Sequence, residues 1–334
     1  MSENPSHRPL VSVVIETVTA RYDVKSSASM ADDLAPTLLG LRRQTYPADL
    51  IETIIVLDPD VPDAAVEAVH RRFGFARFVG SPVKNYFAAK NAGAQAARGS
   101  VIALLDGDCE PDAVWLERLV SRLGPDDAAV CGRTRYAAVT PLAKTLAVPD
   151  FGYVVGDASG AASGFNVNNV AFRREVLLEH PLDARLRRDG GCYFLYYQLR
   201  AAGERVAYED RAVVVHAVND IRGTRFMHKH FARGADGVSV YRLDDADVLR
   251  GSRLFRRFGV PALVAITARR IALDWVRLAR HHEQIGISAP LVPYYWMVAV
   301  AIRLIELAGM VAAAVTPDRY AVEARDAAHV PSRA

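Results

Sequence analysis

Cysteine is scarce in this sequence of 334 residues, and the three that are present, Cys109, Cys131 and Cys192, lie far apart. None of them forms a C-x-x-C pair, so their spacing indicates neither a disulfide framework nor a zinc site. The first ten residues, "MSENPSHRPL", also lack the charged and then apolar pattern of a secretory signal peptide. These absences favour a protein of a reducing compartment, the cytoplasm.

An excess of charge of one sign is lacking too, because 41 Lys and Arg residues against 38 Asp and Glu residues give a net charge of only +3. The overall charge therefore does not indicate a polyanionic partner, and the position of the charges matters more. Internal repeats and low-complexity tracts are absent. With 51% hydrophobic and 24% charged residues, the chain has enough apolar side chains for a sizeable core of one or two domains.

Apolar runs and helical segments alternate in the first third of the chain. "LVSVVIETV" (10–18), "IETIIVLD" (51–58) and "SVIALLD" (100–106) are continuous runs, typical of strands that are covered on both faces. Their alternation with helical segments predicts an α/β fold with a mostly parallel sheet and helices on both faces. Ligands of such sheets bind at the carboxyl ends of the strands, where Asp58 and Asp106 stand.

The pattern is less regular beyond residue 112. Residues 32–47 are predicted as one helix that ends at Pro47, and 205–218 as a strand pair or a single strand. The other expected elements are a helix over 113–124, a loop, strand and helix start over 164–180, and an amphipathic helix over 192–203.

Acidic residues follow the third apolar run in "ALLDGDCEPD" (103–112). Asp106 and Asp108 flank Gly107, and two carboxylates on a tight turn suit a hard divalent cation such as Mg²⁺ or Mn²⁺. A cation held there would stabilise the negative charge of a departing nucleoside diphosphate. Ordinary helix caps or solvated loop residues are the alternative interpretation.

The chain resembles the family 2 glycosyltransferases of the GT-A fold in four segments, "VSVVIETV", "IIVLD", "AAKNAGAQAARGSVIALLDGDCEPD" and "NNVAFRREVL". The resemblance covers residues 10–220 and is most specific over 88–112. It implies a Rossmann-like GT-A domain, a nucleotide-sugar donor (a UDP-sugar first), a divalent metal and transfer of the sugar to an acceptor hydroxyl.

The resemblance also implies roles on the donor side. Glu16, Thr17 and Asp58 match positions that cradle the nucleotide base, although the family usually has proline where Glu16 stands. Lys90 matches a basic residue that approaches the donor, and its alternative is a lysine solvated on a helix surface.

A metal site follows from the same resemblance. Asp106 matches the carboxylate near the ribose and the metal, and Asp108 matches the direct metal ligand. His216 resembles a histidine that completes metal binding in some GT-A enzymes, with a structural histidine after an apolar strand as the alternative. The implied cofactor is Mg²⁺ or Mn²⁺.

The resemblance breaks where the catalytic base is expected. Inverting members carry a Glu-Asp pair at the start of the helix that aligns with "CYFLYYQLRAAG", and this alignment places Gly191 and Cys192 there. A thiol with a pKa of about 8.5 is a poor base near neutral pH. Asp189 becomes the candidate base; a helix cap at Asp189, another carboxylate, a mechanism other than inversion, and loss of activity are the alternatives.

Two asparagines, Asn168 and Asn169, are expected on the acceptor side, because amides both donate to and accept from sugar hydroxyls. Buried amides that tie down a loop are the competing interpretation.

The C-terminal third is basic and then strongly apolar. Its basic and aromatic stretch (225–259) would fit nucleic acid, a loop over the donor diphosphate, or anionic lipid, but no nucleic-acid recognition fold accompanies it. The uncharged run 285–302 is about long enough to span a bilayer, yet Arg303 and Glu306 interrupt it. We favour interfacial or re-entrant helices at the inner face of the cell membrane over a packing or oligomer interface, and both over a transmembrane span.

The predicted organisation is a flexible leader (1–9), a GT-A domain (10–220) and an apolar helical region (221–334) in peripheral contact with the membrane. The predicted function is that of a hexosyltransferase whose acceptor is a glycan, a lipid-linked glycan or a small molecule, as in polysaccharide biosynthesis, with no nucleic-acid partner. A nucleotidyltransferase is one alternative, although "VVIETVTARYD" lacks its Gly-rich phosphate loop. A non-catalytic binding protein on a degenerate transferase scaffold is the other.

Overall fold

The computed structural model describes residues 10–17, 27–137, 154–186, 189–217, 224–284 and 286–317, so the predicted leader lies outside the described residues. Eight described strands form one sheet in the order β3-β2-β1-β4-β7-β6-β8-β5. Their bounds are Val11–Glu16 (β1), Ile51–Leu57 (β2), Ala76–Gly80 (β3), Val101–Asp106 (β4), Cys109–Pro111 (β5), Asp127–Tyr136 (β6), Asn169–Arg173 (β7) and Arg205–His216 (β8).

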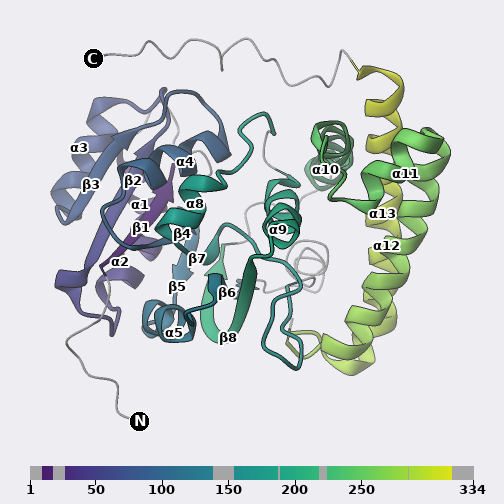
Figure 1. Cartoon of the computed structure of the whole chain (residues 1–334). Helices are drawn as coiled ribbons and strands as arrows, with labels where there is room; N and C mark the ends of the chain where they lie inside the picture. The colour runs from purple at the N-terminus through teal and green to yellow at the C-terminus, as the bar shows by residue number, and fades with distance from the viewer. Residues whose placement is uncertain are drawn as a thin grey trace.

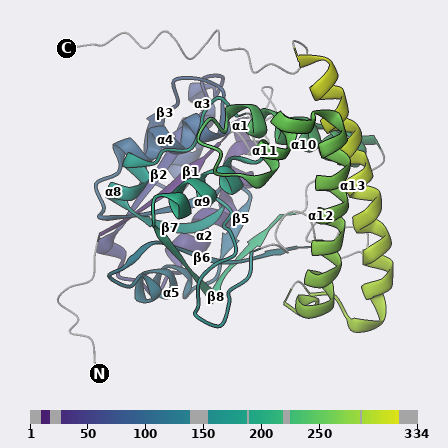
Figure 2. The same ribbon diagram turned by 45° about the vertical axis from the view of Figure 1, so that its right-hand side comes forward.

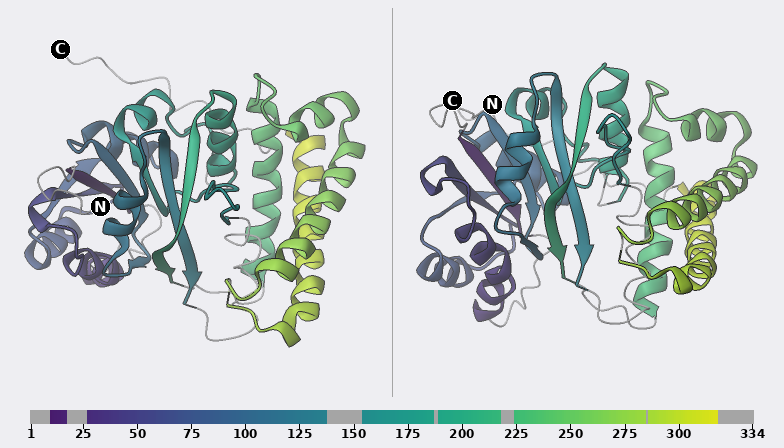
Figure 3. Two further views of the ribbon diagram at one scale, coloured as in Figure 1. Left: turned by 60° about the horizontal axis from the view of Figure 1, so that its bottom comes forward. Right: turned by 90° about the horizontal axis from the view of Figure 1, so that it is seen from below.

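Helices surround the sheet, and four of them form a separate layer beside it (Figures 1 and 3). The helices that pack on the sheet are α1 (Ser27–Asp33), α2 (Ala35–Arg42), α3 (Asp63–Arg72), α4 (Tyr86–Ala96), α5 (Trp115–Arg122), α8 (Arg174–Glu179) and α9 (Gly191–Ala201). The C-terminal layer contains α10 (Thr224–Leu243), α11 (Arg250–Phe258), α12 (Val260–His281) and α13 (Val292–Val315).

The sheet is parallel in its first half and mixed in its second. Strands β3, β2, β1 and β4 pair in parallel, as the alternating pattern predicts. Strand β7 pairs antiparallel with both β4 and β6, and β5 pairs antiparallel with β8. The pairing of β6 with β8 is parallel again. The predicted α/β fold class is confirmed, with a mixed sheet in place of a mostly parallel one.

Both faces of the sheet are buried, which explains the continuous apolar runs. Successive strand residues point to opposite faces. Val13 and Ile15 belong to the apolar cluster under α1, α2, α3 and α5, whereas Val14 belongs to the cluster under α4, α8 and α9. At Gly93 of α4, an added Cβ would overlap the side chain of Val14, so the helix lies directly on the sheet.

Two elements differ from the predictions for a clear physical reason, and a third decides between two predicted alternatives. The single helix expected over 32–47 is two helices, because Pro36 in the first turn of α2 cannot continue the hydrogen bonding of α1. Strand β6 was not predicted, since Gly132 and its arginines hide the apolar pattern. Strand β8 is a single strand, which settles the alternative left open for residues 205–218.

The C-terminal helices pack on the sheet domain through a shared core. Val238 of α10, Leu263 of α12 and Met310 of α13 belong to the same apolar cluster as Val14. Helices α10 and α13 touch backbone to backbone, because an added Cβ at Gly309 would overlap a backbone carbonyl of α10. The domain boundary at residue 220 stays a prediction, and residues on both sides of it share one core.

Candidate active site

The carboxyl ends of β1, β2 and β4 bring the predicted donor residues together. The strand register places Glu16 beside Val56 on one side and beside Asp106 on the other. The hydroxyl of Thr17 accepts from the backbone N–H of Asp58 at 2.9 Å and donates to the carbonyl of Val56 at 3.1 Å. The ends of β1 and β2 are therefore tied together, with the buried side chains of Glu16 and Asp58 at one edge of the sheet.

One carboxylate oxygen of Asp58 is buried and accepts no hydrogen bond from any described residue. Its Oδ1 accepts weakly from the N–H of Asp60 at 3.3 Å, while Oδ2 lies 3.7 Å from the ammonium of Lys84 and has no hydrogen bond within the described part of the chain. A buried acceptor left in this state costs free energy, so this oxygen fits an N–H or O–H donor from a ligand.

Lys90 and Tyr86 both contact the buried carboxylate of Asp106. The side chain of Asn85 caps α4 by accepting from the N–H groups of Phe87 and Ala88 at 2.9 Å. One turn apart on this helix, Tyr86 donates to Asp106 at 2.8 Å and the Lys90 ammonium lies 2.7 Å from the same carboxylate. Burial by itself would raise the pKa of Asp106, but the charge and hydrogen bond of Lys90 lower it below the usual value. Lys90 is fully buried, so the alternative of a solvated lysine is wrong.

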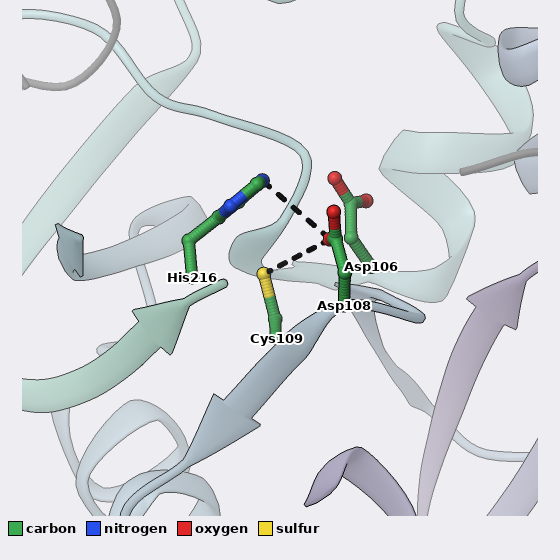
Figure 4. A group of neighbouring side chains, drawn as sticks. All are labelled: Asp106, Asp108, Cys109 and His216. Carbon is green, nitrogen blue, oxygen red and sulfur yellow. Dashed lines mark hydrogen bonds and ion pairs between the residues drawn. The ribbon is translucent and has the colours of Figure 1, made fainter. Parts of the chain in front are cut away.

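A group of four potential metal ligands lies just beyond β4 (Figure 4). The ligand atoms of Asp106, Asp108, Cys109 and His216 all lie within 4.8 Å of one another. The antiparallel pairing of β5 with β8 places Cys109 opposite His216, and this register carries the histidine to the acidic turn. The Nε2 atom of His216 lies 3.5 Å from Oδ1 of Asp108.

The chemistry of these donors fits a divalent cation. Nδ1 of His216 lies 2.8 Å from the carbonyl oxygen of Ala217, which can only accept, so Nδ1 carries the proton. Nε2 then points a lone pair toward the carboxylate of Asp108. A cation between the two atoms would make this contact favourable, and 3.5 Å is short enough for both atoms to bind the same cation.

The start of α9 is tightly packed at the position where the expected Glu-Asp pair is missing. An added Cβ at Gly191 would overlap the ring of Phe87, so a side chain at this position would require that ring to move. Burial, together with the charges of Asp106 and Asp189, raises the pKa of Cys192 to about 11. The thiol stays protonated near neutral pH and is not a base.

Asp189 lies just before α9, next to the left-handed residue Gly190 (φ 87°). Its Oδ1 accepts from Nε of Arg233 on α10 at 3.2 Å. The carboxylate is partly exposed, at 24% of its side-chain surface, so a substrate can reach it. Its role as a base stays a prediction.

The two asparagines lie in the interior. Asn169 accepts from the indole N–H of Trp115 at 2.8 Å and donates to the carbonyl of Ala212 at 3.2 Å. Asn168 accepts from the hydroxyl of Thr134 at 3.2 Å. These contacts match the interpretation of buried amides that tie strands together, and acceptor binding stays a prediction that no described contact supports.

Three neighbours of the site were not predicted. Tyr86 stands four residues before Lys90, so the helical period alone could have indicated that both contact Asp106. Arg233 and Phe87 gave no such signal, because their contacts with Asp189 and Gly191 depend on how α10 and α4 pack around α9.

Comparison of the sequence with protein families matches residues 26–173 to the family described as "Glycosyl transferase family 2". "Glycosyltransferase AglE" of Haloferax volcanii is 31% identical over 120 residues, which are 34% of this chain and 36% of that protein. "Probable N-acetylgalactosaminyltransferase 9" of Caenorhabditis elegans is 29% identical over 126 residues, which are 36% of this chain and 20% of that protein. The matches thus span about a third and a fifth of these curated relatives.

Comparison of the structure finds similar folds over a larger part of the chain. The mannosyltransferase PcManGT from Pyrobaculum calidifontis, in complex with GDP-Man and Mn²⁺, superposes with a TM-score of 0.62 at 19% identity. This likeness covers 93% of the present chain and 88% of PcManGT. GalNAc-T7 with UDP, GalNAc and Mn²⁺ gives a TM-score of 0.55 at 16% identity, over 75% of this chain and 51% of that one. At these identities the likeness shows a shared fold.

Proposed function

The chain belongs to the family 2 glycosyltransferases and has their GT-A fold, and we propose that it transfers a hexosyl group from a nucleoside-diphosphate sugar to an acceptor hydroxyl. The observation that carries this proposal is the gathering of Asp58, Asp106, Asp108 and His216 at the carboxyl ends of the strands. The match to this family argues against the alternative that the chain is a nucleotidyltransferase.

The donor site would consist of a nucleotide part and a diphosphate part. The unbonded oxygen of Asp58, beside Glu16 and Thr17, supports a role in holding the base or ribose. Asp108 and His216, with Asp106, would hold Mn²⁺ or Mg²⁺, which supplies positive charge to the leaving diphosphate when bound. The similar structures contain GDP-mannose or UDP, with Mn²⁺ in both, so UDP-sugars and GDP-mannose are the first donors to test.

Lys90 would act on the donor through Asp106. Its ammonium is buried against that carboxylate and donates to the carbonyl of Leu105 at 3.1 Å, which leaves it little freedom to reach a ligand directly. We therefore assign to Lys90 the positioning of Asp106, in place of a direct contact with the sugar.

Asp189 is the proposed general base. Its carboxylate would take the proton from the acceptor hydroxyl while the oxygen forms a bond to the anomeric carbon. The bond from that carbon to the diphosphate oxygen breaks, and the nucleoside diphosphate leaves with the electron pair, so the anomeric configuration inverts. The contact with Arg233 supports this role, because the guanidinium fixes the direction of the carboxylate.

A membrane surface is the proposed location of the acceptor. Within the described residues, one helix, Ala289–Val315, is long and apolar enough to cross a membrane by length and composition. Its two interrupting charges turn inward: Arg303 pairs with Asp274 of α12 at 2.7 Å and with Glu306 at 2.6 Å, and all three are buried. This inward pairing keeps the charges away from the outer face of the helix, and we propose that the helix lies along the membrane.

Helices α12 and α13 lie side by side at the side of the molecule away from β1, β2 and β3 (Figure 2), and both carry large exposed apolar side chains. We define the outer stripe as Val264, Trp275, Tyr294, Met297, Leu304 and Val315, all exposed. Arg257, Arg269 and Arg280 on the same layer are exposed as well, which suits anionic lipid. The proposed setting is the inner face of the cell membrane, with a lipid-linked or cell-surface glycan as acceptor.

A donor-hydrolysis panel tests the proposed activity. UDP-, GDP- and dTDP-sugars are incubated with the enzyme and Mg²⁺ or Mn²⁺, and release of the nucleoside diphosphate is measured for the wild type and for Asp108→Ala. Wild-type turnover that Asp108→Ala abolishes supports the proposal, and full metal-dependent turnover by Asp108→Ala overturns it. Nucleotide binding without turnover by the wild type would support the non-catalytic scaffold. The Phe87 ring, which occupies the space beside Gly191 where a catalytic side chain is expected, favours that alternative.

A further inference from the structure

Cys109 adds a sulfur atom to an otherwise hard metal site. Its Sγ lies 3.9 Å from Oδ1 of Asp108 and within 4.8 Å of the ligand nitrogen of His216 (Figure 4). The residue is fully buried and its backbone pairs with that of His216, so both side chains are held in place by the ladder between β5 and β8. A sequence motif could not reveal this group, because Cys109 has no cysteine nearby in the chain.

We propose that Asp108, Cys109 and His216 together form a Zn²⁺ site, in which Zn²⁺ binds more tightly than Mn²⁺ or Mg²⁺. Oxygen ligands alone suit Mg²⁺ and Mn²⁺, whereas thiolate and imidazole ligands favour Zn²⁺. Zn²⁺ also exceeds Mn²⁺ in affinity for most nitrogen, oxygen and sulfur donor sets, so the sulfur increases an existing preference. On binding, the Cys109 thiol releases one proton to solvent and forms a metal–thiolate bond.

Asp106, the remaining member of the group, already has partners of its own. Its carboxylate accepts from Tyr86 and pairs with Lys90, and both partners come from the rigid helix α4. With Asp108, Cys109 and His216 as ligands, Zn²⁺, which prefers four, would leave at most one position for a donor oxygen, and none if Asp106 is the fourth ligand. Mn²⁺ accepts about six ligands and leaves more positions for the diphosphate. Zn²⁺ in this site is therefore an inhibitor of transfer, a consequence that rests on the proposed function, whereas the binding itself does not.

Calorimetric titration of the metal-free protein with Zn²⁺ and with Mn²⁺, without nucleotide, tests the binding. Cys109→Ser should weaken Zn²⁺ binding on the order of tenfold or more and change Mn²⁺ binding by less than about threefold. Cys192→Ser is the matched control, since this thiol lies outside the four-residue group, and it should change neither affinity. Equal Zn²⁺ affinity for the wild type and Cys109→Ser overturns the proposal.

Co²⁺ gives a second readout that needs no variant. The wild-type Co²⁺ complex should show the near-ultraviolet charge-transfer absorption of a sulfur–cobalt bond, and its absence overturns the proposal even if Cys109→Ser does not fold. Failure of sugar transfer with an intact Zn²⁺ result would refute the proposed function alone. Unchanged Mn²⁺ and Zn²⁺ affinity in Asp108→Asn would refute the metal site itself.

Discussion

At the scale of single residues, the site depends on buried charges that lie next to their partners. Asp106 and Lys90 are both removed from water, and each compensates the burial of the other. A buried pair of this kind adds little net stability compared with apolar residues, but removal of one partner leaves an uncompensated charge. Substitution of only one of the two residues should therefore lower the free energy of unfolding.

Lys90→Met is expected to lower the free energy of unfolding by about 3–5 kcal/mol, because it leaves the carboxylate of Asp106 buried without its cation. Chemical denaturation of the metal-free protein measures the change. The double variant Lys90→Met with Asp106→Asn removes both charges. Its free energy of unfolding should lie closer to that of the wild type than the value of the single variant does. A cost below about 1 kcal/mol for the single variant would show that solvent reaches the pair.

Asp189→Asn is expected to lower kcat by about 10²–10⁴-fold with little change in the KM for the donor, because the amide cannot accept the acceptor proton. Cys192→Ser should stay near the wild-type rate, since burial already keeps the thiol protonated, with its pKa at about 11. Steady-state kinetics on both variants separates the two residues. A large decrease of kcat in Cys192→Ser, together with a small decrease in Asp189→Asn, would reverse the assignment of the base.

The residues differ in how far the sequence predicts them. Asp106 and Asp108 stand in one short motif, so a local pattern was sufficient to propose them. His216 and Asp58 required the strand order, because they come to the same edge of the sheet only through β8 and β2. Phe87 and Arg233 act across a helix packing interface, and no local pattern encodes such contacts.

At the scale of elements, the C-terminal helices are joined by a buried ionic cluster. Glu306 of α13 contacts Arg303 on its own helix, Arg270 of α12 at 3.2 Å and the imidazole of His230 on α10 at 3.6 Å. Burial alone would raise the pKa of Glu306, but the guanidinium groups of Arg270 and Arg303 hold it well below its usual range. The cluster therefore connects three helices through one ionised carboxylate.

Glu306→Gln should destabilise the protein most at neutral pH. A lowered folded-state pKa gives a stabilisation that is complete above the ordinary carboxyl pKa of 4.5 and is lost as the pH falls toward the folded-state value. The difference in unfolding free energy between wild type and variant should shrink as the pH falls from about 7 to about 3. Urea titrations across this range measure it, and a difference that does not change with pH would contradict the prediction.

Elements with continuous apolar runs were predictable, and those with mixed patterns were not. Strands β1, β2 and β4 are covered on both faces, so their sequences carry a strong signal. Strand β6 includes Asp127, whose buried carboxylate pairs with Arg122 and Arg205. These ion pairs permit charge in the interior, and they hide the strand from any pattern based on hydrophobicity.

At the scale of the whole molecule, the candidate active site and the outer stripe belong to one packed unit, since α10, α12 and α13 share the apolar core of the sheet. Helix α10 joins the two regions directly: Arg233 contacts Asp189, and three residues earlier His230 approaches Glu306. The position of the proposed base relative to the outer stripe is therefore set by the packing of these helices.

The outer stripe should bind anionic lipid vesicles, and its substitution should reduce that binding. Each large apolar side chain that leaves water contributes about 1.5–3 kcal/mol, so Met297→Glu and Leu304→Glu together should weaken partitioning by more than about tenfold. Flotation with phosphatidylglycerol vesicles, and with phosphatidylcholine vesicles for comparison, measures the effect. Phe75→Glu is the matched control, because Phe75 is an exposed apolar residue before β3, on the sheet domain.

The same variants distinguish the membrane from a second copy of the chain. If the outer stripe is an oligomer interface, light scattering will show a wild-type dimer that Met297→Glu with Leu304→Glu converts to a monomer, and vesicles will not float either protein. If it lies on the membrane, the wild type will be monomeric without lipid, and higher salt will weaken its binding because exposed arginines such as Arg269 contribute attraction that ions screen. Binding that neither the substitutions nor salt affects would place the membrane contact elsewhere on the molecule.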